Sequence, residues 1–272
     1  MKIGITFLLL ALYCSVSAQH NIHRKVYSTK MHKNVDVIIV TPDIQKDVRY
    51  KTVYILHGYS GNPMRTIEQD IPDLSQKAIE FQTIYIIPDG NYNSWYVDSP
   101  LNAQLQYSTF IGDELIRYID LHFPTQENRN ARGLLGWSMG GFGALHIGVA
   151  YPKVFSIIGS SCGAIDFNHF GKGYQDYQVD KVLGELEELS PSFRIYNNVD
   201  KMIHNEQRYI LDCGTEDIQM LEMNRSLHQQ LTDKNIEHLY IESPGAHDSA
   251  YWHKSLVNQL VLFQNYFGHE GL

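Results

Sequence analysis

The stretch that decides the fold is RGLLGWSMGGFGALHIG, residues 132–148, in which one serine stands between two glycines. The apolar run GLLGW precedes Ser138, and a helical pattern follows it directly. The G-x-S-x-G spacing alone is weak evidence. However, a sharp strand-to-helix turn exposes a serine side chain, and Gly136 and Gly140 would keep the flanking backbones from clashing. The pattern therefore predicts that Ser138 is a nucleophile, with a structural serine in a tight turn as the alternative.

Apolar runs and helical patterns alternate along most of the chain. The apolar runs end in turn residues, as strands buried on both faces of a parallel sheet do; they cover residues 51–58, 83–90, 132–138, 155–163, 208–214 and 237–245. Helical patterns cover residues 109–123, 139–151, 218–235 and 255–267. This alternation predicts a single α/β domain with a mostly parallel central sheet flanked by helices.

Two segments fall outside this alternation. Residues 35–42 predict an early strand, paired in a hairpin with residues 25–31. Residues 164–205 carry no clear pattern, and we interpret them as an insertion over the sheet that forms a lid or a side wall. Because ligands bind beyond the carboxyl ends of parallel strands, the polar residues that end each run are the candidates for a functional site.

The first 18 residues have the layout of a secretory signal peptide. Lys2 gives a basic start, an apolar run follows, and small residues lead to Ala18, after which cleavage is expected. The apolar run is too short for a comfortable membrane span, so no stable membrane insertion is expected. We therefore predict an exported protein, periplasmic or secreted, whose residues 19–272 form one domain.

Charge and cysteine content exclude several classes of partner. Lysine and arginine number 22 against 30 acidic residues, and no basic block appears, which argues against a nucleic-acid partner. Cys162 and Cys213 remain after the predicted cleavage, and no Cys/His spacing matches a metal site. We expect no metal and no organic cofactor. We expect both cysteines to be buried free thiols. A single Cys162–Cys213 disulfide bridge is the alternative.

A serine nucleophile needs a base, and the base needs an acid to orient it. In this type of fold the chain order is serine, acid, histidine. His247, in ESPGAHDSAYW, lies between the last predicted strand and the last predicted helix, which favours it as the base over a solvated loop histidine. In YILDCGTEDIQM, Asp217 is favoured as the acid over Asp212, although Asp217 could instead cap the following helix.

The oxyanion of the reaction intermediate needs backbone N–H donors. Met139 follows the serine at a predicted helix start, so its N–H is the first candidate. The second candidate is the N–H of Tyr59 in LHGYSGN, residues 56–62, where glycines allow close approach. His57, in the same turn, is predicted to brace the loop.

Together, LHGYSG, PDGNYNSWYVDSP, RGLLGWSMGGFGALHIGVAYPKVF, LDCGTED and PGAHDSAYWHKSL resemble the putative esterase family of α/β-hydrolases, over residues 35–267. That family includes S-formylglutathione hydrolases, tributyrin-type esterases, and the feruloyl and acetyl xylan esterases of carbohydrate esterase family 1. The resemblance implies an α/β-hydrolase fold with Ser138 as nucleophile, Asp217 as acid and His247 as base. It also implies oxyanion donors at Met139 and near Tyr59.

Within that resemblance, SWYVDSP is most similar to the short-acyl, tributyrin-type branch, where Trp95 and Tyr96 would lie beside the active site. Trp137 departs from the family pattern, because relatives usually carry leucine, histidine or a similar residue there. Trp95, Tyr96 and Trp137 are therefore the predicted substrate-binding residues.

These observations predict a serine carboxylic-ester hydrolase that works through an acyl-enzyme. The expected reaction removes short acyl groups, acetyl above all, from a small ester or an acylated polysaccharide. A feruloyl esterase and an S-formylglutathione hydrolase-like thioesterase are the alternatives within the same chemistry. A non-catalytic carbohydrate-binding relative is the alternative from another class.

Overall fold

The computed structural model describes residues 20–267, so the predicted signal peptide lies outside the described residues. The described chain forms an eight-stranded sheet in the order β1-β2-β4-β3-β5-β6-β7-β8. The strands are β1 (Asn21–Ser28), β2 (Lys33–Val40), β3 (Lys51–Leu56), β4 (Thr83–Pro88), β5 (Arg132–Trp137), β6 (Ile157–Ser161), β7 (Arg208–Gly214) and β8 (His238–Ser243).

Strand direction divides the sheet into two parts. β1 pairs antiparallel with β2, with Val26 opposite Val35, and β2 pairs antiparallel with β4. From β4 to β8 every pairing is parallel. The predicted early hairpin and the predicted mostly parallel sheet are both confirmed.

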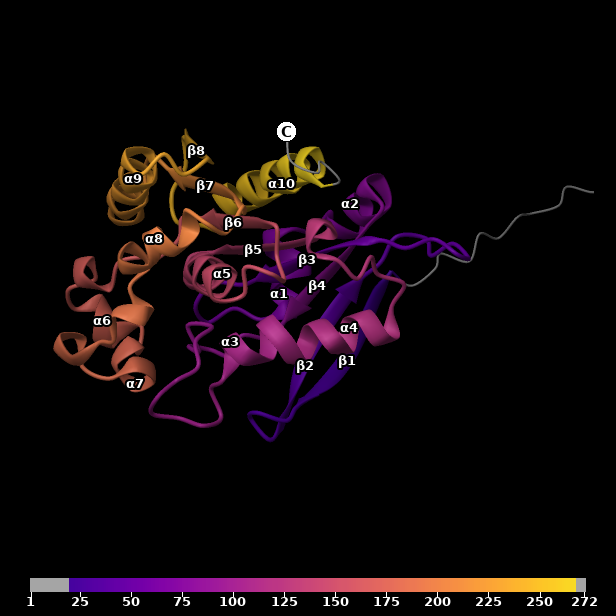
Figure 1. Cartoon of the computed structure of the whole chain (residues 1–272), viewed down its shortest axis with the longest axis horizontal. Coiled ribbons are helices and arrows are strands. Elements are labelled where there is room, and N and C mark those ends of the chain that lie inside the picture. Colours follow the sequence, from indigo (N-terminus) through magenta and orange to yellow (C-terminus); the bar gives the residue numbers. More distant parts are fainter. Residues whose placement is uncertain (1–19, 268–272) are drawn as a thin grey trace, which may run out of the picture.

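Helices cover both faces of the sheet (Figure 1). α2 and α10 lie on one face, and α4, α5 and α9 lie on the other. The longer helices are α2 (Leu74–Phe81), α4 (Leu115–His122), α5 (Met139–Ala150), α9 (Ile218–Asp233) and α10 (Ser249–Tyr266). The short ones are α1 (Pro63–Arg65), α3 (Tyr107–Thr109), α6 (Gly173–Asp176), α7 (Val179–Leu183) and α8 (Val199–Met202). Single π-helical turns cover Thr66–Asp70 and Phe110–Glu114, and 3₁₀ turns cover Arg129–Ala131, Phe167–His169, Leu186–Glu188, Pro191–Phe193 and Ile195–Asn198.

The helices differ from the sequence prediction in three segments. α10 begins at Ser249, earlier than predicted, because the Asp248 side chain caps it by accepting a hydrogen bond from Tyr251 N at 2.9 Å. The segment from Pro63 to Phe81 forms α1, a π-helical turn and α2, none of which the sequence pattern predicted. The helical pattern of residues 109–123 is split between the end of α3, a π-helical turn and α4.

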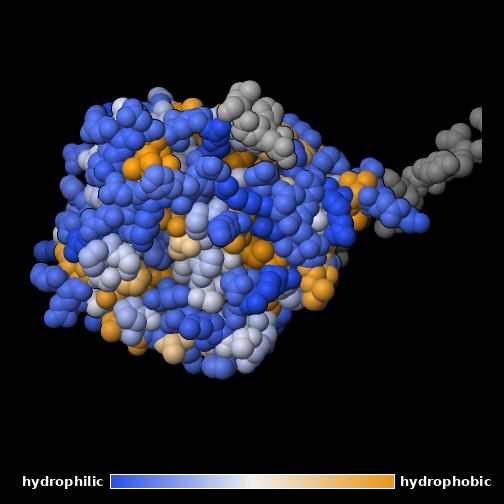
Figure 2. Space-filling model, in the orientation of Figure 1, coloured by the Kyte–Doolittle hydropathy of each residue, from blue (hydrophilic) through white to orange (hydrophobic). Residues whose placement is uncertain are grey.

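The core consists of two apolar layers, one on each side of the central strands. Every residue of β5 is buried, and alternate side chains point to opposite faces. A Cβ added to Gly133 or Gly159 would meet Phe263 of α10, whereas Ile158 packs against Gly148 of α5. On the face drawn in Figure 2, apolar side chains form only small, separate groups. Within residues 20–267, no helix is both long and apolar enough to cross a membrane.

Residues 164–205 form a chain of short helices at one side of the sheet (orange in Figure 1). Phe167, Phe170 and Tyr174 anchor the segment through buried rings, and the Tyr174 hydroxyl donates to Gly184 O at 2.8 Å. The segment lies beyond the carboxyl end of β6, the edge of the sheet at which Ser138 also lies. It is therefore placed to contribute a wall to a site at that edge.

Candidate active site

Ser138 occupies a strained turn between β5 and α5. Its backbone has φ 54° and ψ −119°, a conformation that residues with a side chain rarely adopt. A Cβ at position 136 would lie 2.2 Å from Gly140 O, and one at position 140 would lie 2.0 Å from Leu56 O. Both glycines are therefore required by the close approach of the backbones, as the sequence predicted.

Ser138, His247 and Asp217 form a continuous hydrogen-bonded chain. His247 Nε2 lies 2.9 Å from Ser138 Oγ, and His247 Nδ1 lies 2.5 Å from Asp217 Oδ2. The three residues follow β5, β8 and β7 respectively, so the parallel sheet gathers them at the carboxyl edge of its strands. With Nδ1–H donating to Asp217, Nε2 is free to accept the proton of the serine hydroxyl.

Asp212, the other candidate acid, lies in a separate buried network. Its carboxylate accepts hydrogen bonds from Ser161 Oγ at 2.8 Å, Ser255 Oγ at 2.7 Å, Tyr251 OH at 2.9 Å and Gln259 Nε2 at 2.5 Å. These partners tie β6 and β7 to α10. Asp212 therefore links the sheet to a helix, and none of these hydrogen bonds involves His247.

Burial alone would lower the pKa of His247, but its hydrogen bonds outweigh that effect and raise the pKa to about 9. Asp217 is the charged partner and is itself buried. Cys162 also contacts the ring, yet its thiol is neutral, because the neighbouring Cys213 and burial raise the pKa of the thiol. The Asp217 carboxylate therefore favours the protonated imidazole.

Cys162 and Cys213 are both buried free thiols, as the sequence favoured. Cys162 directly follows β6 and Cys213 lies on the neighbouring β7, and Cys162 N donates to Asp212 O at 2.8 Å. The ligand atoms of Cys162, Asp217 and His247 lie within 4.8 Å of one another. The Cys162 thiol therefore lies close to both the His247 imidazole and the Asp217 carboxylate.

The two expected oxyanion donors flank Ser138. Met139 is the first residue of α5, where a backbone N–H has no partner within the helix. Tyr59 lies in the turn after β3, and Gly61 N donates to Gly58 O across that turn at 3.0 Å. Neither the Tyr59 nor the Met139 N–H is used by a turn or loop hydrogen bond of the described chain.

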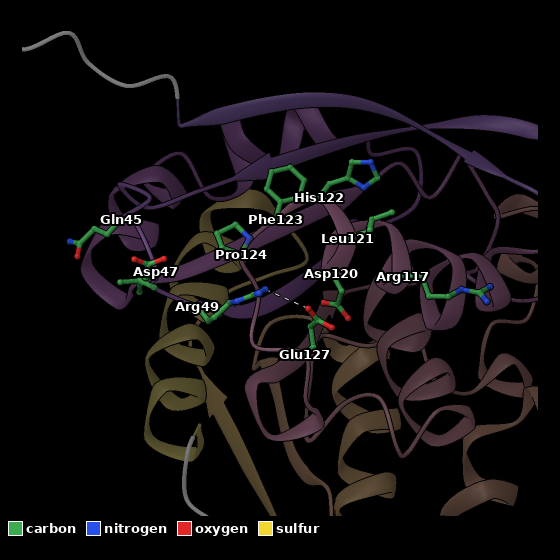
Figure 3. A pocket seen from close by; sticks show the side chains of 11 residues that line it. Gln45, Asp47, Arg49, Arg117, Asp120, Leu121, His122, Phe123, Pro124 and Glu127 are labelled. Atoms are coloured by element: carbon green, nitrogen blue, oxygen red, sulfur yellow. Dashed lines mark hydrogen bonds and ion pairs between the residues drawn. The ribbon is translucent and has the colours of Figure 1, made fainter.

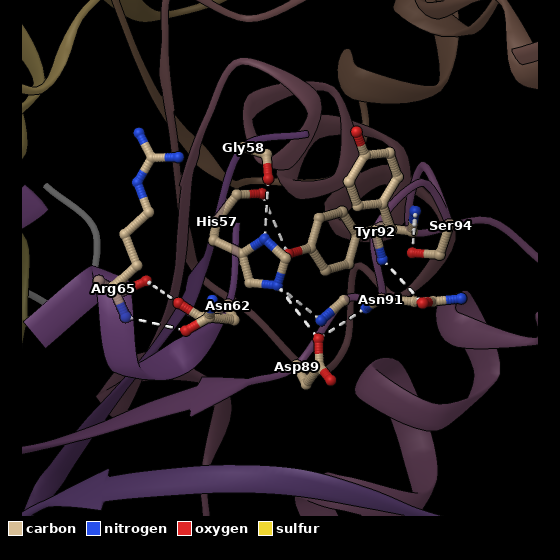
Figure 4. Close-up of polar contacts among 11 residues, drawn as sticks. His57, Gly58, Asn62, Arg65, Asp89, Asn91, Tyr92 and Ser94 are labelled. Carbon is tan, nitrogen blue, oxygen red and sulfur yellow. Dashed lines mark hydrogen bonds and ion pairs between the residues drawn. The ribbon is translucent and has the colours of Figure 1, made fainter. Parts of the chain in front are cut away.

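His57 holds the turn after β3 in place, and Figure 4 shows its contacts. Its Nε2 accepts from Gly90 N at 2.8 Å, which places the ring proton on Nδ1, 2.8 Å from Gly58 O. The imidazole is fully buried and bridges the ends of β3 and β4. The prediction that His57 braces the loop is confirmed.

Tyr96 does not reach the site, contrary to the sequence prediction. Its ring is fully buried against Gly90 and Gly143, and its hydroxyl donates to His57 O at 3.1 Å. Trp95 and Tyr96 both have positive φ, 52° and 54°. This double turn leaves the Trp95 side chain at the cavity and the Tyr96 side chain packed against the turn after β3.

A cavity of about 400 Å³ opens above Ser138, within the size range of small-molecule sites. Trp95 and Trp137 line it, as predicted, together with Trp252. The side wall from residues 164–205 contributes Ala164, Phe170 and Tyr177. Further lining residues are Gly58, Tyr59, Ser60, Gly61, Arg65, Asp70, Asp217, Gln219, Met220 and His247.

A wider hollow of about 900 Å³ lies elsewhere, between the loop after β2 and the end of α4 (Figure 3). Five of its eleven lining residues are charged, and Arg49 pairs with Glu127 across it at 3.4 Å. Its lining includes none of the three hydrogen-bonded residues around Ser138. The smaller cavity is therefore the candidate active site.

Comparison with known proteins places the chain in a family of esterases, in agreement with the hydrogen-bonded serine, histidine and aspartate. The model of the family described as Putative esterase matches residues 28–263. The chain belongs to this esterase family. The esterase is 30% identical over 256 residues to the acetyl esterase of Caldicellulosiruptor saccharolyticus, an alignment that covers 85% of this chain and 93% of that protein. The protein is accordingly a carboxylic ester hydrolase.

Solved structures show the same fold at lower sequence identity. The fluorophosphonate-binding serine hydrolase FphF of Staphylococcus aureus has a TM-score of 0.81 and 20% identity, covering 90% of this esterase and 98% of that chain. The S-formylglutathione hydrolase FrmB of the same organism has a TM-score of 0.79 and 20% identity, with the same coverage. The α/β-hydrolase fold is thereby confirmed.

Several cavity residues of the esterase were missed by sequence reasoning. Trp252 lies on α10, just before the helical pattern that the sequence predicted for residues 255–267, and its ring meets the His247 ring edge-on at 5.0 Å. Arg65 and Asp70 lie in the unpredicted helical segment after β3. The signal that could have found them is their position directly after the predicted oxyanion loop.

Proposed function

We propose that this esterase is an exported serine hydrolase that removes short acyl groups, acetyl above all, from carbohydrate or other small esters. The observation that carries the proposal is the hydrogen-bonded chain Ser138–His247–Asp217 at the floor of a 400 Å³ cavity. The acetyl esterase relative supports the acyl group. Export rests on the signal-peptide pattern of residues 1–18.

In the proposed mechanism, Ser138 Oγ attacks the ester carbonyl while His247 Nε2 takes the hydroxyl proton. Asp217 holds Nδ1–H and stabilises the imidazolium, and the N–H groups of Met139 and Tyr59 stabilise the oxyanion. As the tetrahedral intermediate collapses, His247 gives its proton to the leaving alcohol. Water then attacks the acyl-enzyme by the same steps, which releases the acid and restores Ser138.

Trp95 and Trp137 narrow the cavity and favour a short acyl group. A feruloyl group is the second candidate, because the cavity also holds Phe170 and Tyr177, whose rings could meet an aromatic acid. A glutathione thioester is disfavoured by the expected export. A non-catalytic relative is disfavoured because no residue of the proposed triad is missing.

The proposal is tested first by Ser138→Ala. Loss of a nucleophile of this kind costs about 10⁵- to 10⁶-fold in turnover, with an intact fold by circular dichroism. An organophosphonate should label wild type at Ser138 and leave the variant unlabelled. A variant that keeps a tenth of wild-type activity would end the serine-esterase proposal.

Substrate and export are tested separately. Parallel rates on acetyl, butyryl and feruloyl esters of one alcohol should fall in that order for wild type. N-terminal sequencing of the protein recovered from outside the cytoplasm should begin after Ala18. Faster feruloyl hydrolysis would refute the short-acyl proposal, and an intact N-terminus would refute cleavage.

A further inference from the structure

A pair of charged side chains lines the cavity but takes no part in the proposed reaction steps. Arg65 ends α1, and Asp70 ends the π-helical turn that follows it, so both come from the segment after the oxyanion loop. The Asp70 side chain is only 2% exposed, whereas that of Arg65 is 35% exposed. Figure 4 shows the Arg65 guanidinium extending away from Asn62, which binds only its backbone.

The pair leaves hydrogen-bonding capacity unused. Arg65 Nε lies 3.7 Å from Asp70 Oδ2, which is too far for a hydrogen bond. Within the described chain, this buried Nε has no hydrogen-bond partner at all. Burial raises the pKa of Asp70, and only its other oxygen is bonded, accepting from Ser249 Oγ at 2.7 Å. A ligand hydroxyl on the cavity side of the pair can donate to the free Asp70 oxygen while it accepts from the exposed end of the guanidinium.

The pair lies on the side of the cavity to which the leaving alcohol must go. Ser249, which holds Asp70, follows His247 by two residues, and α10 packs against the turn that carries Asp70. His247 must protonate the leaving oxygen, so the alcohol lies on the histidine side of Ser138. Trp252 lies there too, beside the His247 ring, and its buried Nε1 has no partner in the described chain.

We propose that Arg65 and Asp70 form a subsite for a free hydroxyl of the leaving alcohol, and that this alcohol is a sugar or similar polyol. The inference rests on the proposed function, because it assigns the alcohol of the ester that Ser138 attacks. The opposite charges of the pair suit a neutral hydroxyl better than an anion. An alkyl or aryl alcohol would leave the buried Asp70 oxygen without a donor, which costs binding free energy.

The test compares two acetates that differ in the hydroxyls of the alcohol. Monoacetylated methyl β-D-xylopyranoside carries free hydroxyls on a six-membered ring, and cyclohexyl acetate carries none. Arg65→Met and Asp70→Asn should each lower kcat/KM on the sugar acetate about tenfold or more, and change it less than about twofold on cyclohexyl acetate. The matched control is Arg117→Met, a surface arginine paired with Asp113 outside this cavity, which should change neither.

Two further variants separate recognition from structure. Ser249→Ala removes the hydrogen bond to Asp70 but keeps both charges, so it should retain the preference for the sugar acetate. If Asp70→Asn does not fold, Arg65→Met alone decides the question. Equal losses on both acetates, or no loss on either, would overturn the subsite.

A binding measurement keeps this inference distinct from the proposed reaction. All three tryptophans of the chain line the cavity, so tryptophan fluorescence reports on its occupancy. Methyl β-D-xylopyranoside should change the fluorescence of Ser138→Ala, and adding Arg65→Met should weaken that binding about tenfold. If wild type hydrolyses neither acetate, the proposed function fails, and the fluorescence measurement still tests the subsite. Equal binding of methyl β-D-xylopyranoside to Ser138→Ala with and without Arg65→Met would overturn the subsite.

Discussion

Replacing Asp212, which lies within β7, or Asp217, which follows that strand, by asparagine should separate stability from catalysis. Asp217→Asn removes the acceptor that holds His247 Nδ1–H at 2.5 Å, so the ring loses its orientation and its favoured tautomer. Turnover should fall about 10⁴-fold, as expected when the acid of such a triad becomes an amide. The folded structure should change little, because Asp217 makes no comparable network elsewhere.

Asp212→Asn is the matched control, because it changes the same functional group a short distance along the chain. Asp212 accepts hydrogen bonds from Ser161, Ser255, Tyr251 and Gln259, and an amide oxygen can accept only part of that set. Hydrogen bonds to a charged group contribute about 1.5–3 kcal/mol each. With partial rearrangement, we expect a loss of about 2–4 kcal/mol in the free energy of unfolding.

The two measurements are kcat on p-nitrophenyl acetate and the midpoint of thermal unfolding. For a domain of this size, the expected loss in Asp212→Asn lowers Tm by roughly 5–15 °C. Its kcat, measured well below that Tm, should stay within about tenfold of wild type. The reasoning is refuted if Asp212→Asn loses the turnover while Asp217→Asn loses the thermal stability.

Two further predictions concern pH and acyl size. Because the pKa of His247 is raised to about 9, the base is protonated at neutral pH, and kcat/KM should rise with pH to half its plateau near pH 9. Asp217→Asn should shift that rise to lower pH; a wild-type midpoint at or below 6.5 would contradict the raised pKa. Trp95→Ala should reduce the preference for acetyl over feruloyl esters of one alcohol, measured as the ratio of the two kcat/KM values. If wild type instead prefers feruloyl esters and the variant loses that preference, Trp95 is a stacking surface for the acyl group and not a limit on its length.

The residues that the sequence predicted well are those whose geometry depends on their immediate neighbours. The turn at Ser138 follows from two nearby glycines, and both are confirmed by contacts of 2.2 Å or less for an added Cβ. The choice of His247 needed only the order of the strands. The sequence distinguished less well between Asp212 and Asp217 as the acid, because the choice depends on where the strand ends. β7 ends at Gly214, between the two residues.

The cavity walls were harder to predict because they come from segments far apart in the chain. Arg65, Phe170, Tyr177 and Trp252 converge only once the sheet is formed. No local pattern shows that a helical tryptophan on α10 faces outward to the site. The prediction for Tyr96 was wrong for a different reason. Trp95 and Tyr96 both have positive φ, which turns the chain and buries the Tyr96 ring. The spacing of residues in the sequence does not predict such a turn.

The aromatic residues around the site do not by themselves indicate an aromatic substrate. Trp95 is only 2% exposed, because Phe142, Phe167 and Phe170 meet its ring from several directions. Its Nε1 also donates to Tyr177 O at 3.2 Å, which fixes the indole against the side wall. A stacking platform needs an exposed ring face, whereas a fixed ring with covered faces acts as a boundary. The contacts of Trp95 therefore favour its role as the limit on acyl length, and they favour short acyl groups.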